Sequence, residues 1–88
     1  MVYITQIRLV GGVTHAHISQ VAWRNPVDGR TGISTRAGMI DFIGGGGQAF
    51  VTDGVRSVAV GVVHANPPYI RTYADGVWTD NLLALPRF

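Results

Sequence analysis

Cysteine, lysine and glutamate are all missing from this chain. Without cysteine there can be no disulfide framework, no thiolate metal site and no thiolate nucleophile. Charged residues make up only 14% of the chain, all of them Arg or Asp, whereas about 25% is typical of globular domains. The low charge and the 47% hydrophobic content predict apolar surface that a partner covers, so we expect a homo-oligomer.

Long hydrophobic runs are missing too. No apolar stretch reaches the roughly 18 residues that a membrane-spanning helix requires, and the N-terminus lacks the basic region and apolar core of a secretory signal. We therefore expect a soluble, cytoplasmic protein without a membrane partner. The formal net charge of +2 is too small to imply, by itself, electrostatically driven binding to nucleic acid.

The 88 residues present suffice for a single domain spanning 1–88. Runs rich in β-branched residues, separated by Gly, Pro and Asp-Gly turn signals, predict strands over residues 2–10, 14–24, 48–52, 55–64 and 69–73. In the second run Ile18, Val21 and Trp23 are expected to point inward. The three-residue step from Ile18 to Val21 breaks the two-residue period of a strand and predicts a β-bulge.

One short helix is predicted between the second and third of these strands. Ser34 or Thr35 can cap its N-terminus. The helix is expected to run to Ile43, which shares one face with Met39 and Ile40 because residues three and four apart are neighbours on a helix.

The glycine run at 44–47 follows this helix and ends it. Gly44 is expected to take the left-handed conformation that often closes a helix. A phosphate-binding loop would have to come after a strand and open onto a helix, so the run is interpreted as a plain connector.

The last residues still carry large apolar groups, which a disordered tail would lack. The tail is therefore predicted to dock, with Asp80-Asn81 capping a short turn over residues 82–85. Together these elements predict an α+β fold, in which a small twisted antiparallel sheet of about five strands packs with one short helix and a docked C-terminal tail.

The C-terminal region also contains a pattern of residues that resembles a known family. Its residues are Arg71, Asp75-Gly76, Asn81-Leu82, Leu85-Pro86 and Phe88. This pattern resembles the C-terminal signature of domain-of-unknown-function family 3892, small proteins found in bacteria and their phages. The resemblance implies a fold but supplies no activity and no catalytic residues.

The best candidate site is what we call the Arg/aromatic face, consisting of Tyr69, Arg71 and Tyr73 on one side of the last predicted strand, together with Trp78. A guanidinium group between aromatic rings can bind phosphate or carboxylate while the rings stack on a base or an amide. The alternative is structural: Arg71 could pair with Asp75 or Asp80 and hold the tail in place.

Two other functions stay open. His15 and His17, if on a strand, point to the same side and could bind a metal with His64, Asp28 or Asp53 as third ligand. A metal-dependent hydrolase or nuclease using His15, His17 and His64 would require such a site. Alternatively, Arg8, Arg24, Arg56 and Arg71 could make a nucleic-acid-binding domain. No HExxH or comparable fixed-spacing motif identifies a hydrolytic site.

No nucleophile elbow or paired-carboxylate motif supports catalysis. We therefore expect a non-enzymatic binding or interaction module, without a cofactor, that presents the Arg/aromatic face to a phosphate-bearing small molecule or to a protein partner. The phage occurrence that the resemblance implies suggests a module that sequesters a nucleotide signal or blocks a host protein.

Overall fold

The computed structural model describes residues 1–88, which form one seven-stranded sheet and one α-helix. The strands are β1 (Val2–Leu9), β2 (Ile18–Arg24), β3 (Thr31–Thr35), β4 (Ala49–Thr52), β5 (Ser57–Val63), β6 (Tyr69–Ala74) and β7 (Val77–Thr79), and the helix is α1 (Arg36–Gly44). A 3-10 turn, η1 (His15–His17), precedes β2. The α+β class is confirmed, but the expected five strands are seven.

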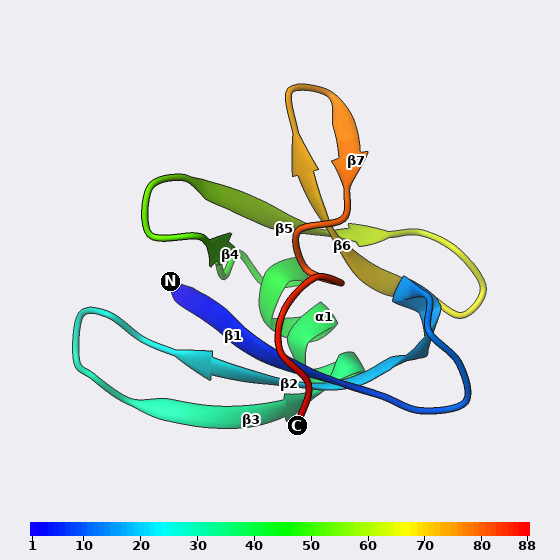
Figure 1. The fold of residues 1–88 in the computed structure, drawn as a ribbon, viewed down its shortest axis with the longest axis horizontal. Helices are drawn as coiled ribbons and strands as arrows, with labels where there is room; N and C mark the ends of the chain where they lie inside the picture. Colours follow the sequence, from blue (N-terminus) through cyan, green and yellow to red (C-terminus); the bar gives the residue numbers. More distant parts are fainter.

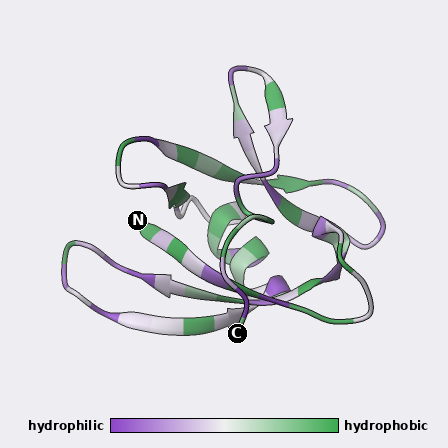
Figure 2. Ribbon diagram, viewed as in Figure 1, coloured by the Kyte–Doolittle hydropathy of each residue, from purple (hydrophilic) through white to green (hydrophobic).

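The order across the sheet is β3-β2-β1-β4-β5-β6-β7. All neighbours are antiparallel except β1 and β4, which run parallel over a short stretch. Figure 1 shows β1–β3 and β4–β6 curving apart around α1, with the tail crossing on the opposite side of the molecule from the helix. Hydrophobic and hydrophilic residues alternate along β1, whereas β5 is mostly apolar (Figure 2).

The predicted bulge lies in β2. Leu9 of β1 is opposite Ile18, and Arg8 is opposite Gln20, so Ser19 is the extra residue. That extra residue brings Ile18 and Val21 to the same fully buried face, as expected. The strand itself begins only at Ile18, because the four residues before it belong to the 3-10 turn and its cap.

Helix α1 begins where Thr35 caps it: the Thr35 Oγ1 accepts a hydrogen bond from the Gly38 N–H. Met39 is buried, and the other two residues of the predicted face pack against the core. The expectation for Gly44 was wrong, since it is the last helical residue. The left-handed conformation falls instead on Gly46, with φ 100°.

The core lies between the sheet, α1 and the tail. Its 11 buried hydrophobic residues are Val2, Ile4, Ile7, Ile18, Val21, Met39, Ala49, Val51, Val60, Ile70 and Leu82. Leu82 belongs to the tail and is fully buried, so the tail contributes to the core as β-strands do. No helix of the protein is long and apolar enough to cross a membrane.

The tail also completes β1. Strand β4 pairs only with Val2 and Tyr3, which leaves the rest of that edge of β1 open. There the Ile7 N–H donates to the Pro86 carbonyl (3.0 Å), and the Phe88 N–H donates to the Ile7 carbonyl (3.1 Å). The prediction of a docked tail is confirmed.

Candidate functional site

The Arg/aromatic face lies on the outer side of the β6–β7 hairpin. Ile70 and Thr72 are fully buried, so the residues that alternate with them in β6 point to the opposite face. Asp75 and Gly76 connect the strands with φ of 53° and 79°, as in the two-residue type I′ turn that Asp-Gly favours. This tight turn explains why β7 follows at once and places Trp78 beside β6.

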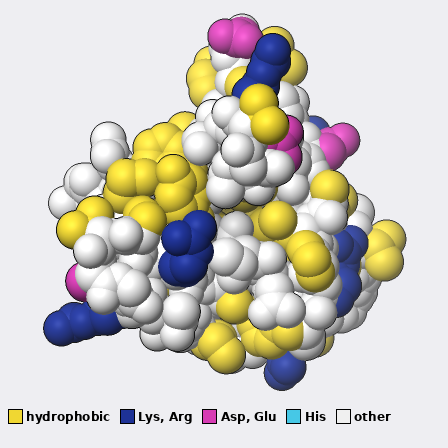
Figure 3. Space-filling model, turned by 60° about the vertical axis from the view of Figure 1, so that its left-hand side comes forward, with side chains coloured by type: hydrophobic (Ala, Val, Ile, Leu, Met, Phe, Trp, Pro, Cys, Tyr) yellow, Lys and Arg dark blue, Asp and Glu magenta, His cyan; other side chains and the backbone are white.

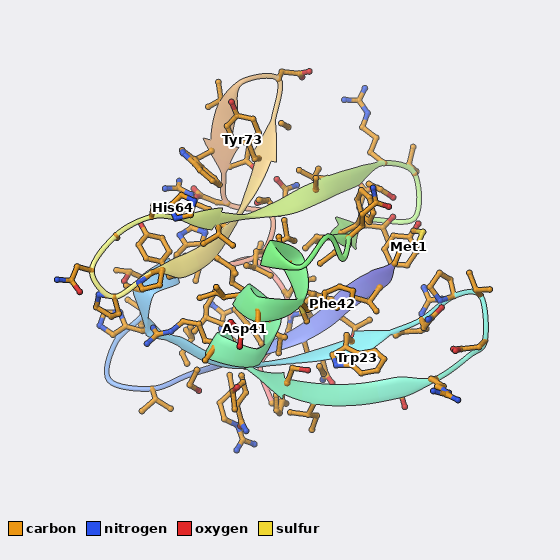
Figure 4. All side chains as sticks on the ribbon, turned by 180° about the vertical axis from the view of Figure 1, so that it is seen from behind. Met1, Trp23, Asp41, Phe42, His64 and Tyr73 are labelled. Carbon is orange, nitrogen blue, oxygen red and sulfur yellow. The ribbon has the colours of Figure 1, made fainter.

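Tyr73 and Trp78 form an exposed aromatic pair. They are opposite each other in the β6–β7 register, and their rings meet at an angle of 68° with centroids 4.9 Å apart. Their exposed fractions are 43% and 38%. Gly61 of β5 lies beneath the indole, where a Cβ would come within 3.4 Å of the ring. In Figure 4 Tyr73 lies on the hairpin that projects from the body of the molecule.

Arg71 is bound on one side by its own hairpin. Its Nε donates to the Thr79 carbonyl (3.0 Å), and its Nη2 donates to Oδ1 of Asp80 (2.8 Å). The structural alternative, in which Arg71 holds the start of the tail, is therefore present in the structure. Nη1 has no protein partner, and the Asp80 side chain is 74% exposed, so water is available to both groups.

His15 is a site residue that the sequence did not connect with Arg71. Its Nε2 lies 3.8 Å from the same Asp80 Oδ1, is buried and makes no hydrogen bond. Burial lowers the pKa of His15 from its ordinary value, the Arg71 charge lowers it further, and the Asp80 charge acts in the opposite direction. His15 is thus held towards its neutral form next to a fixed guanidinium.

A buried hydroxyl pair supports this arrangement from below. Thr72 Oγ1 donates to the Thr79 carbonyl (3.0 Å), and Thr79 Oγ1 donates to Thr72 Oγ1 (2.8 Å). The Leu82 N–H also points at Thr72 Oγ1, at 3.4 Å. The pair fixes β7 and the first residues of the tail relative to Arg71.

The histidines do not form the arrangement expected of a metal site. His15 and His17 lie in a 3-10 turn rather than on a strand. His15 is buried, whereas the His17 Nδ1 lies 2.7 Å from Thr14 Oγ1. No group of three His, Asp or other ligating side chains is placed to hold a metal ion, so His64 does not join them.

The strand register aligns one outward residue from each of the seven strands. In spatial order these are Thr31, Arg24, Tyr3, Phe50, Ala59, Tyr73 and Trp78, which we call the cross-sheet row. Sequence reasoning missed most of it, because the only available signal was that each member alternates with core residues in its own strand. The row extends the Arg/aromatic face across the sheet.

The row contains further ring contacts. Tyr3 and Phe50 have centroids 6.2 Å apart, and the guanidinium carbon of Arg24 lies 5.4 Å from the centre of the Tyr3 ring. Figure 3 shows hydrophobic side chains gathered with Arg on the side that holds the N-terminus and the β4–β5 hairpin. Of the other Arg residues predicted to act together, Arg8 contacts Phe88 of the tail and Arg56 lies before β5.

A separate cavity of about 240 Å³ lies between α1 and the β2–β3 hairpin. It is lined by Val2, Trp23, Asn25, Asp28, Arg30, Ser34, Met39 and Phe42. Figure 4 shows Trp23 and Phe42 on this side of the molecule, remote from the projecting hairpin with Tyr73. The Trp23 Nε1 already donates to Ser34 Oγ (3.0 Å), so the indole is held as a wall of the cavity.

Comparison with known families gives one match. The model of a family described as "Protein of unknown function (DUF3892)" matches residues 3–86. The chain belongs to the DUF3892 family. No curated protein and no solved structure matches the chain. The matched residues include the hairpin with Arg71 and the tail as far as Pro86, and the family description assigns neither of them a function.

Proposed function

We propose that this DUF3892 protein is a non-enzymatic binding module whose Arg/aromatic face holds a phosphate-bearing small molecule with a planar ring, such as a nucleotide. The exposed Tyr73–Trp78 pair beside Arg71 carries this proposal. Exposed rings gain the free energy of apolar burial only when a ligand covers them. A base stacked on an aromatic side chain contributes about 1–3 kcal/mol to binding.

The pairing of Arg71 with Asp80 is compatible with an incoming phosphate. Nη1 is free, and the largely exposed Asp80 carboxylate can turn into water at a cost of about 0–1 kcal/mol, the usual value of an exposed ion pair. A phosphate then meets the guanidinium fork while the ring of the ligand lies on Trp78.

Such a module would sequester its ligand rather than convert it, as expected of a protein that captures a nucleotide signal. We also propose that it works as a homo-oligomer, because 88 residues with 47% hydrophobic content leave apolar side chains such as Ile33 (61% exposed) outside the core. Native mass spectrometry of untagged protein measures both the number of subunits and the mass of any retained ligand.

The direct test measures nucleotide binding by isothermal titration calorimetry. Arg71→Ala and Trp78→Ala are expected to weaken binding by ten-fold or more, whereas Arg30→Ala, an exposed Arg in the β2–β3 turn, is the matched control and should bind like the parent. If folded Arg71→Ala binds nucleotides as well as the parent does, the Arg/aromatic face is not the site.

A further inference from the structure

We infer that the cross-sheet row is a stacking platform for single-stranded nucleic acid. The inference rests on the proposed function, because it uses the same Tyr73–Trp78 pair, but it extends the ligand from one nucleotide to a strand. The observation behind it is the register, which sets Tyr3, Phe50, Tyr73 and Trp78 at one position along successive strands of the curved sheet.

The length of the row suits a polymer better than a single nucleotide. Neighbouring strands are about 4.8 Å apart, so the four steps from Tyr3 to Trp78 span roughly 19 Å. Proteins that bind single strands without reading sequence place successive bases on aromatic side chains along such a path. The exposed Tyr73–Trp78 pair and the partly buried Tyr3–Phe50 pair then meet different nucleotides.

Ala59 sits at the middle of the row, between Phe50 and Tyr73. Its methyl group is short, so the two flanking rings border a gap two strand spacings wide, roughly 10 Å from backbone to backbone. A flat base fits between two rings separated in this way, whereas a larger residue at position 59 would fill the space.

The charge of the sheet complements a polyanion. The seven strands contain no Asp, and their charged residues are Arg8, Arg24 and Arg71. Arg24 lies over the Tyr3 ring at one end of the row. At the other end Arg71, which is paired with the exposed Asp80, is opposite Gly61, the residue beneath the Trp78 indole. Phosphates on either side of the stacked bases therefore meet a guanidinium at both ends.

The exposed rings favour a single strand over a duplex, because base faces are covered in a duplex and free in a single strand. An aromatic ring that stacks on a base contacts the face of the base and not the sugar, so DNA and RNA are both expected to bind.

The test compares the affinities of a mononucleotide and of longer oligonucleotides. Binding of thymidine monophosphate, oligothymidine of 12 nucleotides and oligouridine of 12 nucleotides is followed by quenching of Trp fluorescence at low and moderate salt. The oligonucleotides are expected to bind at least ten-fold more tightly than the mononucleotide, and to weaken as salt rises. Phe50→Ala should weaken oligonucleotide binding about five-fold or more and leave mononucleotide binding unchanged.

The matched control is Phe42→Ala, which removes a partly exposed aromatic ring from α1 rather than from the row. Circular dichroism and an unfolding curve confirm that each variant is folded. A second variant, Ala59→Leu, fills the gap without removing a ring and should also weaken oligonucleotide binding.

Each other outcome has a defined meaning. If the mononucleotide binds and oligonucleotides bind no more tightly, the inference is wrong while the proposed function stands. If neither binds, both are wrong. Oligonucleotide binding that survives both Phe50→Ala and Ala59→Leu also overturns it. If the parent binds no oligonucleotide and Phe50→Ala dissociates an oligomer in native mass spectrometry, the row is an interface between copies of this chain instead.

Discussion

The Nη2 of Arg71, in β6, lies 2.8 Å from Oδ1 of Asp80, the residue that follows β7 and begins the tail. The same carboxylate oxygen lies 3.8 Å from the buried Nε2 of His15. One exposed acidic side chain is therefore shared between the guanidinium of the proposed site and an imidazole from a distant turn. The titration of His15 reports on the state of this site.

Replacing Asp80 should change the pKa of His15. The Asp80 charge raises that pKa, whereas burial and Arg71 lower it. Asp80→Asn is therefore expected to lower the pKa of His15 further, because the negative charge of Asp80 no longer offsets the repulsion between the Arg71 charge and a protonated His15. Titration of the imidazole carbon-bound protons by NMR measures the shift, with Asp75→Asn at the hairpin tip as control. An upward shift in Asp80→Asn would contradict the geometry.

The stability of the protein should depend on pH through the same histidine. The native pKa of His15 lies below its ordinary value of 6.5, so below that pH the unfolded chain binds more protons than the folded one. The contribution of His15 to the free energy of unfolding is therefore fully present above about pH 6.5 and is lost as the pH drops towards the native pKa. Urea unfolding at pH 7 and pH 5.5 should show a smaller loss in His15→Gln than in the parent.

Shortening Leu82 should be among the most damaging changes outside the strands. Its side chain is fully buried in the core, and Leu→Ala at such positions costs about 2–5 kcal/mol. Chemical denaturation of Leu82→Ala tests the role of the tail, and Val55→Ala, at a position 90% exposed, is the control with little expected change. Equal stabilities would mean that the tail does not dock in solution.

Two neighbouring glycines should respond to alanine in opposite directions. Gly44 is helical and a Cβ there meets no atom within 4 Å, so Gly44→Ala is expected to stabilise the protein by about 0.5–1 kcal/mol. Gly46 has φ 100°, so Gly46→Ala should destabilise it by about 1–2 kcal/mol. The order of the two melting temperatures decides whether the left-handed residue is Gly46, as described, or Gly44.

Much of the fold could be predicted from signals between residues close together in the sequence. The Asp53-Gly54 and Asp75-Gly76 turns, the cap at Thr35 and the bulge after Ile18 each follow from residues near one another in the sequence. In the structure Asp53 Oδ1 accepts from the Val55 and Arg56 N–H groups, which holds the pKa of that carboxyl below its ordinary value. Short-range chemistry of this kind is visible in a sequence.

The parts of the fold that could not be predicted depend on pairing between strands that are distant in the sequence. Strands β3 and β7 are short and contain no apolar run, and they are strands only because β2 and β6 offer them an edge. The parallel contact of β1 with β4 joins segments far apart in the chain. The cross-sheet row depends on all of these registers together, so no stretch of the sequence contains it. For Arg71 the sequence offered Asp75 or Asp80 as partner in the structural alternative, and the structure pairs it with Asp80, which the tight turn at Asp75-Gly76 brings close.

The way the tail completes β1 also has a consequence for folding. The contact between Arg8 and Phe88 joins residues 80 positions apart, and the edge of β1 near Ile7 has no strand partner until Pro86 and Phe88 reach it. Because long-range closure costs chain entropy before it gains contacts, assembly of the sheet must wait for the final segment. Until then an unpaired edge at the centre of the molecule can pair with a strand of another chain.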